Sequence, residues 1–358
     1  MKIERNHIAD MLALFYITDP ITELTYFIEQ YSIDPNTSIP RVKVIVRTDF
    51  ENADPVVVKC INQKEHPGHI IEQQSVFSEH MRRNGIITPR RYPVVGEEQA
   101  LCLTYYIEDT PLIVTVEEYI GEEIRQIDPG TAYKIGRLMG EMHRIAERDK
   151  LHIEANSIFD VIGYNEASGY NRFKELGEAG HLQLDKYKQI TEMYEHRMKN
   201  LHTVWSELPR FATQGDYSIN NLTWAREEIG IFDYNIAGEE TLVGDMVTEG
   251  LLTAHEMDLA EGLNSEDKLR LFDAFMEGYR GMRELNDTEQ RVLNDLYAVV
   301  ASMWFTSIRY NEDSLEKLVE RGEIDKIEVR LEEIKKILSE NYFKDDSILC
   351  MGSMTRFQ

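Results

Sequence analysis

Cysteine and long apolar runs are scarce in this 358-residue sequence. The three cysteines, Cys60, Cys102 and Cys350, stand far apart and in none of the short spacings that bind zinc, so we expect neither a disulfide framework nor a cysteine metal site. No run of about 20 apolar residues and no N-terminal signal pattern occurs, so we expect neither a membrane span nor secretion. The sequence predicts a protein of the reducing cytoplasm.

Basic residues are also few. The chain has 39 Lys and Arg against 64 Asp and Glu, which gives a net charge of -25. Binding to nucleic acid depends on Lys and Arg clustered against phosphates, so no nucleic-acid partner is expected. An acidic surface suits cationic ligands, but it also serves general solubility, which is the interpretation we favour. With 42% hydrophobic residues the chain can bury a core, and its length has room for about two domains.

The most informative stretch lies between Gln214 and Asp245. Within it Asp216 is followed by Asn221 five residues later and by Asp233 twelve residues after that. Small polar residues after Asp216 predict a loop, and residues 221–224 and 229–232 predict the two strands of a hairpin across a charged turn at 226–228. The hairpin would bring Asn221 and Asp233 together. An amide oxygen beside a carboxylate suits Mg²⁺ that also binds a substrate phosphate, which leaves Asp216 available as a base.

This stretch resembles the catalytic segment of the aminoglycoside phosphotransferase and choline kinase-like family, small-molecule relatives of the protein kinases. The shared features are Gly-Asp with Asn five residues later, a hydrophobic-Asp step and a later Gly-Asp. The resemblance implies that Asp216 accepts the proton of the substrate hydroxyl and that Asn221 and Asp233 hold Mg²⁺. It also implies that Asp245 braces the catalytic loop. The family usually has His before Gly-Asp, and Gln214 at this position can supply the same supporting hydrogen bonds.

The N-terminal part of the chain predicts a small antiparallel sheet. Alternating apolar residues over 24–28 and 42–46 predict two strands after a short helix at 5–16. The first glycine of the chain is Gly68, so the glycine-rich loop with which kinases cover the nucleotide phosphates is absent. The loop at 31–38, which carries hydroxyl and amide donors, is the alternative cover for ATP.

A third predicted strand, Val56 to Lys59, closes with a lysine. By itself such a lysine is more often a solvated edge residue. Its place in the third strand, directly before a helix predicted at 70–83, resembles that of the family's nucleotide lysine and implies that Lys59 binds the α- and β-phosphates. The same resemblance implies Glu72 of this helix as the partner that aims Lys59. Glu79, which lies seven residues on and on nearly the same face, is the alternative partner.

The sheet is completed by three predicted strands, over 91–95, 101–105 and 112–116. The last strand runs directly into Glu117, Glu118 and Tyr119. An apolar strand with this ending resembles the hinge between the two kinase lobes, which implies that the backbone of these three residues binds the adenine edge. On local grounds an ordinary exit from a strand into a loop is an equal alternative.

Helical periodicity follows, over residues 133–146, 184–208, 266–283, 288–308 and 324–338. We therefore predict an α+β, two-lobed protein kinase-like fold, with a small antiparallel-sheet N-lobe over 1–118 and a large, mainly helical C-lobe over 119–358. Between Asp233 and Asp245 there is no Asp-Phe-Gly, no long activation segment and no Ala-Pro-Glu, which argues against a protein kinase. The resemblance implies ATP and Mg²⁺ as cofactors and a small hydroxylated acceptor of the aminoglycoside, amino sugar or amino alcohol type.

Two other functions are alternatives to this phosphotransferase. A non-catalytic nucleotide-binding or interaction module of the same fold is favoured by the missing glycine loop and by Gln214, but the proposed base, both metal ligands and Lys59 are all retained. A metal-dependent hydrolase would need histidine ligands near Asp216, and none lies close in the sequence. The identity of the acceptor, the choice of ATP or GTP and the oligomeric state stay open.

Overall fold

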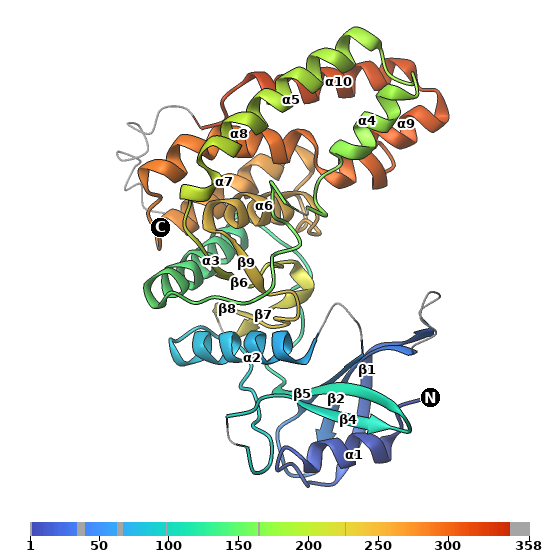
Figure 1. Cartoon of the computed structure of the whole chain (residues 1–358), viewed down its shortest axis with the longest axis vertical. Coiled ribbons are helices and arrows are strands. Elements are labelled where there is room, and N and C mark those ends of the chain that lie inside the picture. Colours follow the sequence, from blue (N-terminus) through green and yellow to red (C-terminus); the bar gives the residue numbers. More distant parts are fainter. Residues whose placement is uncertain are drawn as a thin grey trace. The chain divides into compact units, whose positions relative to one another are not determined.

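The structure is a computed structural model that describes residues 2–33, 40–62, 67–97, 99–163, 165–225 and 227–343. The chain forms two compact units, which are described separately (Figure 1). The first unit comprises Met1–Ser157, Phe211–Glu239 and Leu252–Arg283, and the second comprises Ile158–Arg210, Glu240–Leu251 and Glu284–Gln358. The predicted lobe boundary after residue 118 falls inside the first unit, so the division into those two lobes stays a prediction. Within the described ranges, every helix is too short or too polar to cross a bilayer.

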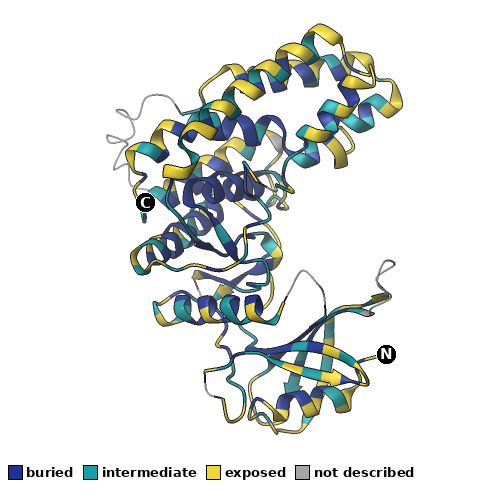
Figure 2. Ribbon diagram, viewed as in Figure 1, coloured by how far each residue is buried: buried dark blue, intermediate teal, exposed yellow. Residues whose placement is uncertain are grey.

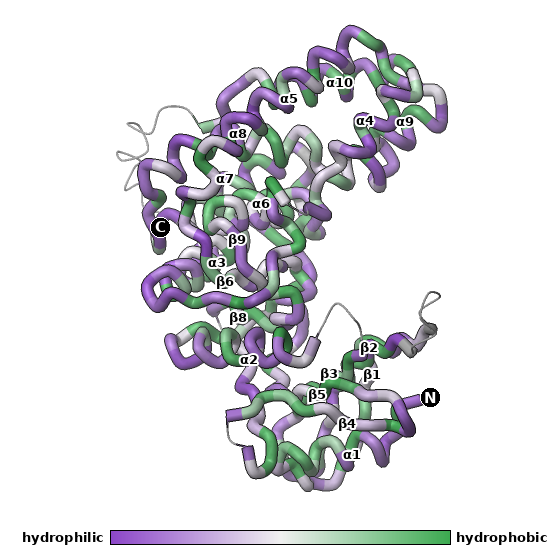
Figure 3. Tube along the Cα trace, in the orientation of Figure 1, coloured by the Kyte–Doolittle hydropathy of each residue, from purple (hydrophilic) through white to green (hydrophobic). Residues whose placement is uncertain are grey.

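Five strands in the described part of the first unit form one antiparallel sheet, in the order β1-β2-β3-β5-β4. They are β1 (Ile21–Ile33), β2 (Pro40–Phe50), β3 (Val56–Asn62), β4 (Leu103–Ile107) and β5 (Thr110–Glu118). Figure 3 shows β3 as mainly apolar, and the sequences of β2 and β5 are apolar in the middle and polar at their ends. The prediction of a strand at 91–95 was wrong, because Arg91 and Val94 form only isolated bridges and Pro93 between them has no amide hydrogen for a ladder.

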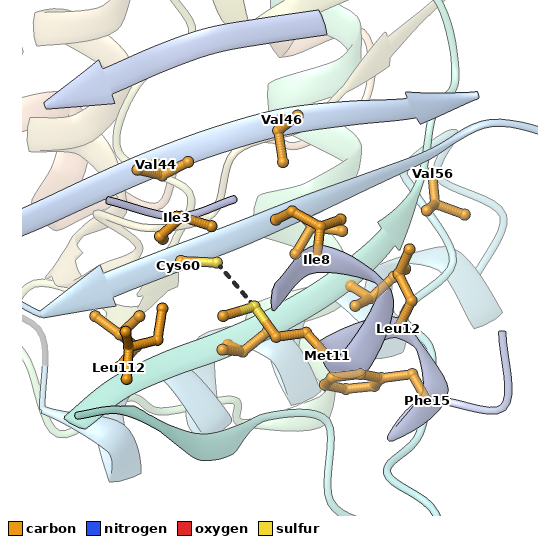
Figure 4. Close-up of a cluster of buried hydrophobic side chains, with 14 of the residues drawn as sticks. Ile3, Ile8, Met11, Leu12, Phe15, Val44, Val46, Val56, Cys60 and Leu112 are labelled. Carbon is orange, nitrogen blue, oxygen red and sulfur yellow. Dashed lines mark hydrogen bonds between the residues drawn. The ribbon is translucent and has the colours of Figure 1, made fainter. Parts of the chain in front are cut away.

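One face of this sheet packs on α1 (Arg5–Ala13), which ends three residues earlier than predicted. Valines of the inner strands meet the apolar residues of α1 there, and the Cys60 thiol lies 3.5 Å from the Met11 sulfur (Figure 4). Successive side chains of a strand point to opposite faces of the sheet. Because Cys60 faces this core, Lys59 faces the other side.

The rest of the first unit is largely helical. Helices α2 (Gly68–Arg83), α3 (Pro129–Asp149) and α7 (Lys268–Arg280) lie where the sequence predicts helices. Asp128 caps the N-terminus of α3, and its carboxylate accepts a 2.7 Å hydrogen bond from the Thr131 amide. It approaches α7 so closely that a Cβ added at Gly136 would lie 1.9 Å from the Phe275 carbonyl oxygen. The two helices therefore need glycine at this crossing.

The predicted catalytic hairpin is present as β7 (Leu222–Ala225) and β8 (Glu228–Ile231). A second pair of short strands, β6 (Arg210–Thr213) and β9 (Gly238–Thr241), was not predicted. Neither was α6 (Leu242–His255), which Figure 2 shows as buried along almost its whole length. A helix without an exposed polar face carries no helical periodicity in its sequence.

The second unit consists mainly of helices. They are α4 (Tyr170–Glu178), α5 (Leu184–Val204), α8 (Asp287–Ser302), α9 (Leu315–Arg321) and α10 (Ile324–Ser339). Helix α5 packs against α8 and α10, and Arg197 of α5 joins them by bonding Asp295 at 2.6 Å and the Leu338 carbonyl at 3.1 Å. The helix predicted over 288–308 ends at Ser302 and is followed by a π-helical turn at Thr306–Tyr310.

A charged cluster around the buried Glu240 lies in the second unit as well. Arg210 forms an ion pair with Asp160, and one of its guanidinium nitrogens lies 3.7 Å from Glu240. The Glu240 side chain is fully buried and accepts hydrogen bonds from the amide and hydroxyl of Thr241 through one oxygen. Burial, together with the nearby charge of Asp160, raises the pKa of Glu240 to about 8.

Candidate active site

A cavity of about 560 Å³ opens within the first unit, on the face of the sheet that is turned away from α1. Side chains of β2 and β3 form one wall, the end of β5 and the turn after it form a second, and the region of the β7–β8 hairpin forms a third. The lining is part apolar, as at Val57 and Phe232, and part charged, as at Lys59 and Asp233. The cavity is therefore lined by predicted residues from two distant parts of the sequence, Lys59 and 117–119 from one and Asn221 and Asp233 from the other, whereas Asp216 is not among the lining residues.

The loop that carries Asp216 is held by Gln214. Gly215 has φ +78°, a left-handed conformation that glycine adopts without strain. The Gln214 side chain is fully buried; its oxygen accepts a 2.8 Å bond from the Asp216 amide and its nitrogen donates a 2.9 Å bond to the Asp233 carbonyl. One neutral side chain thus ties the two halves of the catalytic segment together.

The Asp216 carboxylate is half-buried and accepts a 3.0 Å hydrogen bond from the Ser218 amide. Burial raises the pKa of Asp216, and the negative charge of Asp233 adds to that effect, while the bonds from Ser218 and Asn221 oppose it. A carboxylate with a raised pKa is a better proton acceptor than an ordinary aspartate. The setting of Asp216 therefore suits the predicted base.

Asn221 and Asp233 are brought together as the hairpin prediction requires, since the Phe232 amide donates a 2.9 Å bond to the Asn221 carbonyl. Asn221 itself ends a 3-10 turn (Ile219–Asn221) and does not begin the strand, which corrects the predicted start by one residue. Its side-chain nitrogen donates to the Asp216 carbonyl at 3.2 Å, and this leaves the amide oxygen as its potential metal ligand.

Asp233 has φ +56°, a left-handed conformation that is uncommon outside glycine. Burial alone would raise the pKa of Asp233, but the charge and hydrogen bond of Lys59 bring it below its ordinary value, so that Asp233 is a carboxylate at neutral pH. One of its oxygens lies 3.1 Å from the Lys59 ammonium. An ionised carboxylate and an amide oxygen on one cavity wall fit the oxygen preference of Mg²⁺.

Lys59 is almost completely buried, with 2% of its surface exposed. Besides Asp233 it contacts Glu117, whose carboxylate oxygen lies 2.9 Å from the ammonium. The other oxygen of Glu117 lies 2.7 Å from the guanidinium of Arg91. Lys59 is therefore a buried member of a charge network and not a solvated edge lysine.

The structure contradicts the predicted partners of Lys59 on α2. Glu72 accepts hydrogen bonds from the backbone amides of Leu101 and Cys102, at 3.0 Å each. Glu79 is bound to arginines of its own helix and lies 2.7 Å from Arg82. The partner of Lys59 is decided by the pairing of β3 with β5, which brings Glu117, and no carboxylate of α2, to the lysine.

The three hinge residues all line the cavity. The amide of Glu118 donates to the Arg90 carbonyl at 2.9 Å, and the amide of Tyr119 donates to the Pro55 carbonyl at 3.1 Å. A nucleobase edge would therefore bind other backbone groups of this turn. The Tyr119 ring lies beneath the guanidinium of Arg47, 4.3 Å from its centroid, at the same cavity.

Asp245 and the loop predicted to cover the phosphates are not assigned to this cavity. Asp245 is buried in the first turn of α6 and belongs to the second unit, so its role as a brace stays a prediction. The loop predicted to cover the phosphates contains residues 34–39, which lie outside the described residues, as does Cys350.

Sequence reasoning missed two residues of the site, Arg91 and Gln74. Arg91 stands in a proline-flanked stretch without periodicity. Gln74 of α2 donates 3.0 Å hydrogen bonds to the carbonyls of Asn235 and Ala237, just after Asp233 in the chain. A buried amide among apolar residues of a helix was the available signal for Gln74, and Arg91 had none.

Comparisons with known proteins agree with the fold. No protein-family model and no curated protein matches the chain. A solved microcompartment-associated aminopropanol kinase is 14% identical, with a TM-score of 0.60 over 94% of this chain and 98% of that one. An amicoumacin kinase solved with AMP-PNP and Ca²⁺ is 12% identical, with a TM-score of 0.57 over 97% of each chain.

A third similar structure is an aminoglycoside phosphotransferase from Alicyclobacillus acidocaldarius. It is 12% identical, with a TM-score of 0.53 over 87% of this chain and 93% of that one. At such low identity these similarities establish the fold and leave the chemistry to be argued from the residues. The chain has the α+β, two-lobed protein kinase-like fold of small-molecule kinases.

Proposed function

We propose that this protein is an ATP-dependent phosphotransferase that moves the γ-phosphate to a hydroxyl of a small molecule. The observation that carries the proposal is the convergence of Lys59, Asn221 and Asp233 on one cavity, with Asp216 hydrogen-bonded into the same loop. A cation for phosphates, two oxygen ligands for a metal and a base are the parts that phosphoryl transfer needs.

Each residue has a separate task in this proposal. Lys59 binds the phosphates of ATP, and Asn221 and Asp233 would hold Mg²⁺, which supplies positive charge to the phosphates when it is bound. Asp216 orients the acceptor hydroxyl and accepts its proton, for which its raised pKa is suited. Gln214 keeps Asp216 and Asp233 at a fixed separation through its two hydrogen bonds.

For the acceptor we propose a small hydroxylated amine. Only eleven residues stand between Asp233 and Asp245, which is too few for the long activation segment on which protein kinases bind a peptide. The three similar structures are named for aminopropanol, amicoumacin and an aminoglycoside. The low cysteine content supports the cytoplasm as its location.

Two aspartate variants test this assignment. Asp216→Asn should leave the affinity for Mg²⁺ and AMP-PNP nearly unchanged and slow transfer by ~10²-fold or more, because a positioned base is lost. Asp233→Asn should weaken nucleotide binding itself, because a neutral amide replaces a carboxylate that holds the metal. Calorimetry measures the nucleotide affinity of each variant. ADP release with a panel of amino alcohols, amino sugars and aminoglycosides measures the rate of transfer.

The same measurements distinguish an enzyme from a non-catalytic nucleotide-binding module, the alternative that the missing glycine loop favours. A module would bind nucleotide without acceptor-stimulated ADP release, and Asp216→Asn would then change nothing that can be measured. If the folded wild-type protein binds no AMP-PNP in the presence of Mg²⁺, the phosphotransferase proposal is wrong.

A further inference from the structure

We propose that Glu117, held in place by Arg91, is the residue that positions Lys59 for nucleotide binding, in place of a glutamate on helix α2. The inference rests on the proposed function, because it concerns the same lysine. It assigns a role to a side chain of β5 whose contribution was expected to come from its backbone alone.

The register of the sheet puts Glu117 beside Lys59. Strands β3 and β5 are antiparallel, and Val57 is paired with Glu117 while Lys59 is paired with Thr115. Residues two apart on one strand share a face, so Lys59 and Glu117 are diagonal neighbours on the cavity side of the sheet. Their charged atoms are 2.9 Å apart, and both side chains are at least 96% buried.

Arg91 fixes the other end of the carboxylate. Its backbone forms an isolated antiparallel bridge with Glu117, and the neighbouring Tyr92 amide donates a 3.0 Å bond to the Val116 carbonyl. Its guanidinium lies 2.7 Å from Glu117, and 2% of this side chain is exposed. Glu117 is therefore held between two buried cations, one on each carboxylate oxygen.

The four side chains of this network alternate in charge sign, from Arg91 through Glu117 and Lys59 to Asp233. Lys59 and Arg91 contribute two positive charges, and Glu117 and Asp233 contribute two negative ones. Asp233 is also the proposed metal ligand, so Glu117 is the partner that Lys59 keeps when the carboxylate of Asp233 is engaged elsewhere. Replacement of Glu117 by a neutral residue would leave Lys59 and Arg91, both buried, without their shared partner.

Helix α2 has no acid left for this task. Glu72 is bound to the amides of Leu101 and Cys102, and Glu79 is bound to arginines of its own helix. Gln74 of α2 does reach the predicted catalytic segment, at the carbonyl of Asn235, but it carries no charge. The aim of Lys59 is thus built into the sheet and does not depend on the position of the helix.

The test uses the full-length protein with Glu117→Gln, Glu72→Gln and Lys59→Met, each alone, and the double variant Lys59→Met with Glu117→Gln. Glu147→Gln is the control. This variant also removes a carboxylate that is bound to a buried arginine, Arg283, but neither residue lines the cavity. Calorimetry with AMP-PNP and Mg²⁺ gives the affinity, and ADP release with the best acceptor of the panel gives kcat and KM.

We expect Glu117→Gln to weaken nucleotide binding roughly 10- to 100-fold, the effect of losing one charge-assisted contact in a buried network. Glu72→Gln and Glu147→Gln should stay within about twofold of the wild type on the same argument. The double variant should be no weaker than Lys59→Met alone, because Glu117 acts through the lysine. A purely structural role for Glu117 would instead add its loss to that of Lys59→Met.

The proposal is overturned if Glu72→Gln reproduces the loss of Lys59→Met, or if the effects of Glu117→Gln and Lys59→Met are additive. Should Glu117→Gln fail to fold, Arg91→Lys gives the second reading, since it keeps the charge but loses the geometry of the guanidinium; an unchanged affinity in that variant would overturn the proposal too. If the wild-type protein binds no nucleotide, the proposed function fails first, an outcome distinct from these.

Discussion

Replacement of Glu240 by Gln should remove a pH dependence from the stability of the protein. The carboxyl is fully buried, one of its oxygens bonds to Thr241, and its pKa is raised from 4.5 to about 8. Between these two values the folded protein holds a proton that the unfolded chain has released. The stability of the wild type should therefore fall as the pH rises from about 5 to 8, and level off above pH 8.

The size of the effect follows from the shift. A change of one pKa unit corresponds to about 1.4 kcal/mol, so a shift of about 3.5 units sets an upper limit near ~5 kcal/mol for the full penalty. Most of it develops between pH 5 and pH 8. Because buried sites relax and admit water, we expect ~2–4 kcal/mol over this interval. Glutamine has nearly the same shape and no proton to release, so Glu240→Gln should lose this slope.

Urea unfolding followed by circular dichroism at pH 5 and pH 8 measures the difference. The wild type should lose stability between the two pH values relative to Glu240→Gln. Glu207→Gln is the control, because Glu207 also lies in the second unit but its side chain is 62% exposed. Parallel pH profiles for the wild type and Glu240→Gln would show that the carboxyl is ionised throughout, and the reasoning from burial would be refuted.

Two further predictions concern the first unit. The pKa of Asp216 is raised, so the acidic limb of the pH–rate profile should lie above the ordinary pKa of an aspartate, because the base must be deprotonated. Ser218→Ala should move that limb to still higher pH, since the Ser218 hydroxyl stabilises the charged form of Asp216. A profile unchanged by Ser218→Ala would contradict this. Gly136→Ala should destabilise the protein by about 3 kcal/mol, because its Cβ would overlap a carbonyl of α7. Gly130→Ala is the control: its Cβ would meet nothing closer than 3.4 Å, so the loss of stability should be small. Equal thermal midpoints for the two variants would contradict the close crossing of the helices.

The sequence was sufficient for features that depend on local pattern. Alternation predicted the first two strands of the sheet, and the short apolar runs on either side of a charged turn predicted the hairpin that the structure shows. The partner of Lys59 could not be predicted in this way, because it depends on the register between β3 and β5, whose paired residues lie more than fifty positions apart. Helix α6 was not predicted because a helix that is buried on every side has no hydrophobic periodicity in its sequence.

The glutamine before Gly-Asp has a consequence for acid tolerance. The side chain at position 214 must accept a hydrogen bond from the Asp216 amide and donate one to the Asp233 carbonyl. A neutral imidazole can do both, but an imidazolium has two donors and no acceptor, so a histidine brace would release the Asp216 amide at a pH below about 6.5. The carboxamide of Gln214 does not titrate. The catalytic loop of this protein should therefore keep its hydrogen bonds in acid that would open the same loop around a histidine.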